Sequence, residues 1–365
     1  MRILAPLSSY KEISSLIHAG ADEFYCGIIP QQALYKDINC HASDLSSNFS
    51  SYQELCRSIN LIHKKKKKIF VTLNVPFIAW EQNPDIERTI NSIIEQGIDA
   101  VIVSDIGLLY YLNERYPQLE VHLSIIAGVT NMYAIDFFRE LGVKRIVLPD
   151  HLTLSEIENI AGKNQDISLE IFVLNNKCFN WESVCGFHHW VNDHNPKPPI
   201  PIDFIKKALS HTPQQMLKTI LASSVIQKIF EWGLASQKHL HGCKLNYTVS
   251  AGEHSHEKRY IDQKNKIQQY FQPYSFLRRM NQCGACSLFF AEQYGINAVK
   301  IDGRYFPLKK KMRDIVFVRN CYEQINSISD AAHFSYFCKK QFKKTYGYPC
   351  REEQCYYPEQ FQKYD

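Results

Sequence analysis

Five cysteines in the second half of the chain have the residue type and spacing of metal ligands. They are Cys178 and Cys185 with six residues between them, Cys243 in a His-Gly-Cys segment, and the Cys283-Gly-Ala-Cys286 motif. Thiolates bind zinc or iron–sulfur clusters, and four ligands complete either site. Alternatively, the Cys-x-x-Cys motif forms a redox pair or half of a zinc site. We predict a metal centre built from cysteines that are distant in sequence.

Further cysteines lie elsewhere in the chain. A second group follows toward the C-terminus: Cys321, Cys338, Cys350 and Cys355. This group could form another site, although its spacing matches no common ligand pattern. Cys26 lies in an apolar run and is interpreted as a buried strand residue, since free cysteine often behaves as a small buried hydrophobe.

Strands and helices alternate through the first 175 residues and would position these cysteines. Apolar runs predict strands at residues 3–7, 23–28, 69–75, 100–104, 121–126, 145–148, 168–174 and, after a long interval, 298–301. Helical periodicity lies between them, for example at residues 85–95 and 132–141. This alternation is typical of βαβ units with a parallel sheet, and the number of units approaches that of a TIM barrel.

Polar residues at or near the ends of the expected strands are candidates for chemistry. In a TIM barrel the active site lies at the carboxyl ends of the strands. The candidate catalytic residues that would hydrogen-bond a polar ring edge are Asn74, Asp105, Asn131 and Asp302. Arg304 would hold a carboxylate or phosphate. The alternative is that such residues cap helices or form turns.

The chain divides into four predicted parts. Residues 1–190 carry seven barrel units and the first cysteines, 191–282 form a largely helical insertion, 283–310 complete the barrel, and 311–365 form a tail. A proline-rich stretch near the start of the insertion marks the break in the pattern. The expected fold class is therefore α/β, a TIM-barrel-like parallel barrel with an inserted helical segment and a C-terminal extension.

Composition and charge limit the compartment and the partners. Hydrophobic residues make up 45% of the chain, which allows a sizeable core, but no apolar run reaches membrane-spanning length and no signal-peptide pattern is present. We expect no membrane span and a cytoplasmic location, where clustered cysteines bind metal more often than they form disulfides. The net charge of +5 is mild, so the lysine run at 64–68 is either a solvated face or an RNA contact.

Several short motifs lie along the predicted barrel: Ile3-Leu-Ala-Pro6, Asn48-Phe-Ser50, Val71-Thr-Leu-Asn74, His122-Leu-Ser124 and Val299-Lys-Ile-Asp-Gly-Arg304. Together they resemble the collagenase-like peptidase U32 family. The stretch from Glu170 to Cys185 is similar to the family signature and keeps both cysteines at their spacing. Asn175 and Ser183 stand where the signature has glycines, and Leu174 stands where it has histidine.

The resemblance implies oxidative chemistry on an iron–sulfur cluster. Family members hydroxylate ubiquinone precursors without oxygen, or pyrimidines in tRNA and ribosomal RNA, and several bind a [4Fe–4S] cluster through four cysteines. By position Cys178, Cys185 and Cys283 match cluster ligands, and Cys243 is the candidate for the other ligand, with Cys286 as the alternate. The implied function is a [4Fe–4S]-dependent oxidoreductase that hydroxylates a small aromatic molecule or a nucleobase of RNA.

Two other functions stay open. The altered signature is compatible with a non-catalytic iron–sulfur subunit that works with a U32-family partner in a modifying complex. A U32-type cysteine or metallo peptidase is the other alternative, and its local Cys–His pair would be Cys185 with His188 or His189. Neither a His-Glu-x-x-His nor a Gly-x-Ser-x-Gly motif occurs in the sequence.

Overall fold

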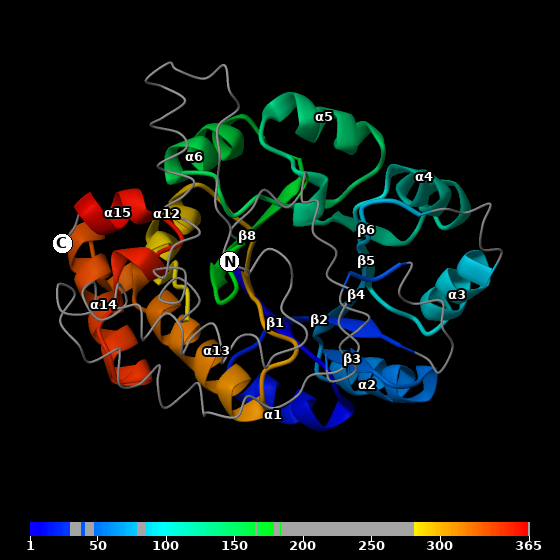
Figure 1. Ribbon diagram of the computed structural model, residues 1–365, viewed down its shortest axis with the longest axis horizontal. Helices are drawn as coiled ribbons and strands as arrows, with labels where there is room; N and C mark the ends of the chain where they lie inside the picture. Colours follow the sequence, from blue (N-terminus) through cyan, green and yellow to red (C-terminus); the bar gives the residue numbers. More distant parts are fainter. Residues whose placement is uncertain are drawn as a thin grey trace, which may run out of the picture.

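Eight parallel strands close into a barrel in the computed structural model (Figure 1). The structure describes residues 1–29, 38–40, 47–78, 85–164, 166–178, 183 and 281–363. The barrel strands are β1 (Arg2–Pro6), β2 (Glu23–Ile28), β4 (Lys68–Leu73), β5 (Ala100–Val103), β6 (Glu120–Leu123), β7 (Arg145–Val147), β8 (Ser168–Leu174) and β9 (Ala298–Ile301). Strand β1 pairs with both β2 and β9, which closes the barrel, and the short β3 (Asn48–Phe49) extends β2.

The closed parallel barrel confirms the predicted TIM-barrel-like α/β fold. Strand β9, which the sequence offered as the last barrel strand, pairs with β8 and β1. The predicted insertion at 191–282 lies almost wholly outside the described residues, so its helical character stays a prediction.

Helices surround the strands because each buries one apolar face (Figure 1). They are α1 (Ile13–His18), α2 (Tyr52–Lys64), α3 (Asp85–Ile94), α4 (Ile106–Arg115), α5 (Met132–Glu140), α6 (Leu154–Lys163), α12 (Leu288–Gln293) and α13 (Leu308–Tyr322). In α3, for example, Ile86, Ile90 and Ile93 are buried at helical spacing. Several of these helices begin at a side-chain cap, such as Thr153, which forms a capping box with Glu156 before α6.

The inside of the barrel combines an apolar layer with buried charges. Leu4, Tyr25, Phe70, Ala100 and Ile102 form an apolar cluster separate from the main core. Below it, Arg145 donates to the carboxylates of Glu23 at 2.6 Å and Glu170 at 3.3 Å. These buried charges are paired, as burial in a low-dielectric interior requires.

A C-terminal extension packs against one side of the barrel (Figure 1). Helix α14 (Ala331–Tyr346) contacts α13 and the short 3-10 turn η8 (Ala285–Ser287), and α15 (Pro358–Lys363) follows. Because η8 belongs to the Cys283–Cys286 motif, the extension lies next to that motif.

Among the described residues, no helix has the length and apolar character to span a bilayer.

Candidate active site at the carboxyl end of the barrel

Arg304 is a buried cation near the carboxyl end of β9. Its side chain is 5% exposed, and its guanidinium lies 5.9 Å from the centre of the Tyr25 ring. Nη1 donates to Thr72 Oγ1 at 3.1 Å and to Asn48 Oδ1 at 3.3 Å. Within the described part of the chain, its hydrogen-bond acceptors are thus neutral oxygens from β4 and β3.

Asp302, the second candidate from this segment, faces the same region. Tyr25 donates its hydroxyl proton to Asp302 Oδ1 at 2.8 Å, and Asn176 Nδ2 donates to Oδ2 at 2.9 Å. Burial, followed by the charge of Asp302, raises the pKa of Tyr25 well above its usual value. Tyr25 therefore stays a protonated hydrogen-bond donor at neutral pH.

Lys300 lies beneath these residues inside the barrel. Its Nζ is 4.4 Å from the centre of the Tyr25 ring and 3.4 Å from Glu170 Oε1. Burial lowers the pKa of Lys300, and the carboxylate of Glu170 opposes this effect. Two basic side chains, Arg304 and Lys300, thus lie over the ring of Tyr25.

The other three candidate residues have different surroundings. Asn74 follows β4, and its buried Oδ1 has no hydrogen-bond partner among the described residues. Asp105 caps α4, because Oδ1 accepts from the backbone N of Leu108 at 2.6 Å and Oδ2 from that of Ile78 at 3.0 Å. Asn131 caps α5 and is exposed. Asn74 therefore keeps an acceptor oxygen without a partner in the described chain, whereas Asp105 and Asn131 cap helices.

Asn175, where the signature has glycine, adopts a left-handed backbone with φ 66°. Asparagine tolerates this region better than other non-glycine residues, so the substitution keeps the turn. Its buried Nδ2 donates to Asp314 Oδ2 at 2.9 Å and to the carbonyl of Asp302 at 3.1 Å. Lys310 Nζ donates to Asn175 Oδ1 at 2.8 Å. The asparagine thereby ties the end of β8 to the end of β9 and to α13.

Two of the predicted cluster ligands lie beyond the carboxyl end of β8. Cys178 follows the strand by four residues, and its backbone N donates to Asp150 Oδ2 at 2.8 Å. The backbone of Cys283 forms an isolated antiparallel β-bridge with Leu174, and Gly284 N donates to the carbonyl of Val173 at 2.8 Å. Residues about 100 positions apart in sequence are therefore held at one strand end. Cys185 and Cys243 lie outside the described residues.

Cys283 is also joined to the C-terminal extension. Its backbone N donates to the carbonyl of Gln354, and Tyr356 N donates to the carbonyl of Cys283. These hydrogen bonds form an isolated parallel β-bridge between the backbones of Cys283 and Cys355. Burial raises the pKa of Cys283 well above its usual value, and that of Cys355 to about 12. Both thiols therefore stay protonated unless a bound metal displaces the proton.

Cys286, the alternate ligand, faces α14. Ser335 Oγ lies 3.5 Å from Cys286 Sγ, and Cys338 Sγ donates to the carbonyl of Ala285 at 3.7 Å. The neighbouring Cys338 thiol lowers the pKa of Cys286, and the Ser335 hydroxyl adds to that effect. The C-terminal cysteines that the sequence left unassigned thus lie beside the Cys-x-x-Cys motif.

Thiols are the donors that iron–sulfur clusters require, and the predicted ligands Cys178 and Cys283 carry them. In the described ranges, no three His, Cys, Asp or Glu side chains gather closely enough to hold a metal ion. Two of the four expected ligands lie outside those ranges. The backbones of Cys178 and Cys283 lie near the carboxyl end of β8, and a cluster that both would bind stays a prediction.

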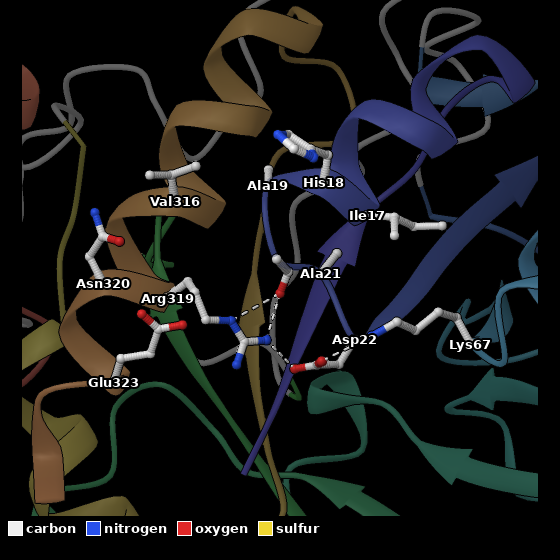
Figure 2. Close-up of a pocket in the computed structure, with 11 residues that line it drawn as sticks. Ile17, His18, Ala19, Ala21, Asp22, Lys67, Val316, Arg319, Asn320 and Glu323 are labelled. Atoms are coloured by element: carbon white, nitrogen blue, oxygen red, sulfur yellow. Dashed lines mark hydrogen bonds and ion pairs between the residues drawn. The ribbon is translucent and has the colours of Figure 1, made fainter.

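A separate polar hollow lies at the opposite end of the barrel (Figure 2). Arg319 reaches from α13 toward Asp22, and their side chains are 2.5 Å apart at the closest oxygen and nitrogen. Lys67 Nζ binds the other oxygen of Asp22 at 3.2 Å. Because Asp22 and Lys67 precede β2 and β4, this hollow lies at the amino-terminal end, and its main charges are already paired.

The sequence did not single out every residue of the carboxyl-end site. Tyr25, Thr72 and Lys300 are interior barrel residues, and strand alternation alone could have placed them on the inner face. Asn39 and Gly27 were not recognisable, because their role depends on the packing of β2 against β3. An added Cβ at Gly27 would overlap Arg304 Nη1, Asn48 Oδ1 and Asn39 Nδ2.

Residues 8–197 match the peptidase family U32, so the chain belongs to this family. This span includes six of the eight barrel strands, β2 and β4 to β8, and both cysteines of the signature. Cys283, β9 and the C-terminal extension follow it.

Three curated relatives illustrate the range of the family. The tRNA hydroxylation protein P of Escherichia coli is 29% identical over 194 residues, which cover 53% of this chain and 40% of that protein. The 23S rRNA 5-hydroxycytidine synthase of Escherichia coli is 29% identical, covering 52% of this chain and 26% of that protein. A collagenase of Porphyromonas gingivalis is 26% identical, covering 53% and 45%. The chain thus spans less than half the length of each of these relatives.

Proposed function

We propose that this protein hydroxylates a pyrimidine base in RNA with a [4Fe–4S] cluster. The observation that carries the proposal is the placement of Cys178 and Cys283 at the carboxyl end of β8, the end that also holds Arg304 and Asp302. The similarity to proteins named for tRNA and rRNA hydroxylation supports the reaction type. A cytoplasmic location, where RNA is available, accompanies this proposal.

Cys178, Cys185 and Cys283 would hold the cluster, with Cys243 as the remaining ligand and Cys286 as the alternate. When bound, a cluster of this kind supplies electron transfer or Lewis-acid chemistry. The protein itself would bind the base, orient it and limit access of water.

The carboxyl-end residues have the chemistry for binding a planar, polar substrate. The buried carbonyl oxygen of Asn74 offers an acceptor, and the Arg304 guanidinium offers donors. Tyr25 keeps Asp302 in place through a 2.8 Å hydrogen bond. Asp302 would accept from an N–H of the base, because its carboxylate is already oriented.

Nucleoside mass spectrometry tests the reaction. RNA from cells with and without the gene is digested, and nucleosides heavier by one oxygen atom are compared. We expect one such nucleoside to depend on the gene and to disappear with Cys178→Ser. Unchanged RNA together with gelatin cleavage that requires Cys185 would instead favour the peptidase activity, for which the collagenase relative is the supporting observation. RNA hydroxylation that needs a second protein would identify the chain as a partner subunit.

A further inference from the structure

Arg304 is a buried cation whose hydrogen-bond acceptors in the described chain are uncharged. A guanidinium is always ionised in proteins, and burying it is costly unless the charge is paired. Arg304 is only 5% exposed. Its two hydrogen-bond acceptors in the described chain are nevertheless the neutral oxygens of Thr72 and Asn48. Among the described residues, no carboxylate accepts a hydrogen bond from this buried cation.

The surrounding residues fix the orientation of this guanidinium. Asn48 Oδ1 accepts from Arg304 Nη1 and also from Asn39 Nδ2, the latter at 3.1 Å. Gly27 on β2 leaves the space that these groups occupy, because a Cβ there would overlap Arg304 Nη1 and both amides. Residues of three strands, β2, β3 and β4, and of the segment that contains Asn39 thus surround Arg304 Nη1.

The other nitrogens of Arg304 are left for a ligand. Nη1 carries both printed hydrogen bonds, so Nε and Nη2 make none to the described residues. These two nitrogens present parallel N–H groups, the geometry that binds carboxylate and phosphate in a bidentate manner. The unpartnered Oδ1 of Asn74, two residues beyond Thr72 in the chain, adds an acceptor at the same end of β4.

We propose that Arg304 binds an oxyanion, a carboxylate or phosphate, carried by the substrate. This inference deepens the proposed function and rests on it in placing the substrate at the carboxyl end of the barrel. Thr72, Asn48 and Gly27 act as positioning residues that hold the guanidinium. The bound oxyanion supplies the negative charge that the described acceptors of Arg304, Thr72 and Asn48, lack.

Calorimetric titration of the full chain with inorganic phosphate and, separately, with acetate at constant ionic strength tests this assignment. We expect one of the two anions to bind saturably and Arg304→Gln to weaken that binding by about tenfold or more, since a charge-assisted hydrogen bond is lost. Arg304→Lys keeps the charge but loses the bidentate geometry, so its anion affinity should lie between those of wild type and Arg304→Gln. Arg115→Gln removes an exposed arginine of α4 and should bind like wild type.

Gly27→Ala gives an independent route to the same result, because it displaces the guanidinium without removing it. Thermal melting of each variant identifies any that fails to fold. Phosphate-selective binding would point to a nucleotide phosphate, and acetate-selective binding to a carboxylate on the substrate. Absence of saturable binding in wild type, or equal affinities in Arg304→Gln and Arg115→Gln, would overturn the proposal. Neither titration requires hydroxylation, so failure of the RNA assay alone leaves this result unaffected.

Discussion

At the scale of single residues, Asn175 shows how a departure from the family signature is accommodated. The position has a left-handed backbone, and the asparagine side chain adds hydrogen bonds with Asp302, Asp314 and Lys310. A glycine would supply the backbone without these bonds. The substitution therefore strengthens the connection between β8, β9 and α13 and does not disrupt the site.

Asn175→Ala should lower the free energy of unfolding by about 2–4 kcal/mol, because buried hydrogen bonds are lost and the left-handed backbone is strained. Asn175→Gly should cost less, since glycine adopts this backbone freely. Asn131→Ala, at an exposed helix cap, serves as the control and should cost about 1 kcal/mol. Urea denaturation measures all three, and an alanine variant as stable as the glycine variant would contradict the argument.

His122 gives a second residue-scale prediction through its pKa. It lies inside the barrel, where burial lowers its pKa, and its Nε2 contacts Glu120 Oε1 at 2.8 Å while Nδ1 has no partner in the described chain. The folded protein therefore favours neutral His122, with the proton on Nε2. As the pH falls below about 6.5, the unfolded chain takes up a proton that the folded chain resists.

Stability should consequently decrease as the pH is lowered from 6.5, by up to about 1.4 kcal/mol per pH unit for this one group. Urea unfolding of wild type and His122→Gln between pH 7 and 5 measures the effect, and the variant should show a shallower dependence. The exposed His63, changed to Gln, provides the matched control. Equal slopes in wild type and His122→Gln would show that another group governs this pH range.

At the scale of elements, α13 closes the barrel through a buried ion pair. Lys311 Nζ lies 2.9 Å from Glu12 Oε2 and also donates to Ser8 Oγ at 2.7 Å. Glu12 Oε2 in turn accepts from the backbone N of Ser8 at 3.0 Å. This network joins the helix after β9 to the segment after β1, the two strands at which the barrel closes.

Lys311→Met should destabilise the protein by about 3–5 kcal/mol, because Glu12 is left buried without its cation. The double variant Lys311→Met with Glu12→Gln removes both charges and should recover part of that loss. Chemical denaturation of the two variants checks the difference. A double variant less stable than Lys311→Met alone would mean that the ion pair is not the source of the effect.

The elements also show what could be predicted from the sequence. Strands at 23–28, 168–174 and 298–301 have the expected bounds, because continuous apolar runs specify buried parallel strands. Residues 125–126 were expected to continue a strand but form a 3-10 turn, since Ser124 caps the backbone N of Ile126. Local pattern therefore located the strands, and side-chain capping changed one of the ends.

The site was less predictable, because its contacts depend on barrel closure. Arg304 and Asp302 were found from the end of a strand, but Asn48 and Thr72 meet Arg304 across more than 230 positions in sequence. Asp105 and Asn131 looked equally suitable, yet their carboxylate and amide oxygens bind helix N–H groups. A single sequence gives no direct information on such pairings.

At the scale of the whole molecule, exposed lysines lie at both ends of the barrel. The lysine run at 64–68 precedes β4 and therefore lies at the amino-terminal end, where Lys67 and Lys68 pair with Asp22 and Glu120. The exposed Lys309, near the start of α13, follows β9 at the carboxyl end. If RNA binds at the carboxyl end, Lys309 is better placed than the lysine run at 64–68 to contact the RNA phosphates.

Charge reversal separates the two ends. Lys309→Glu should weaken RNA binding and reduce the slope of log K against log salt by about one, as expected when one phosphate contact is lost. Lys64→Glu makes the same change of charge at the other end and should leave the slope unaltered. Filter binding at several salt concentrations provides the measurement, and equal effects of both variants would place RNA elsewhere.

The iron and acid-labile sulfide content of protein purified without oxygen tests the central claim most directly. We predict about four irons and four sulfides per chain with visible charge-transfer absorption. Cys178→Ser and Cys283→Ser should each lose them, whereas Cys56→Ser, which changes a thiol on α2, should retain them. Zinc without sulfide in wild type, or a full cluster in folded Cys178→Ser and Cys283→Ser proteins, would contradict a cluster held at the carboxyl end of β8.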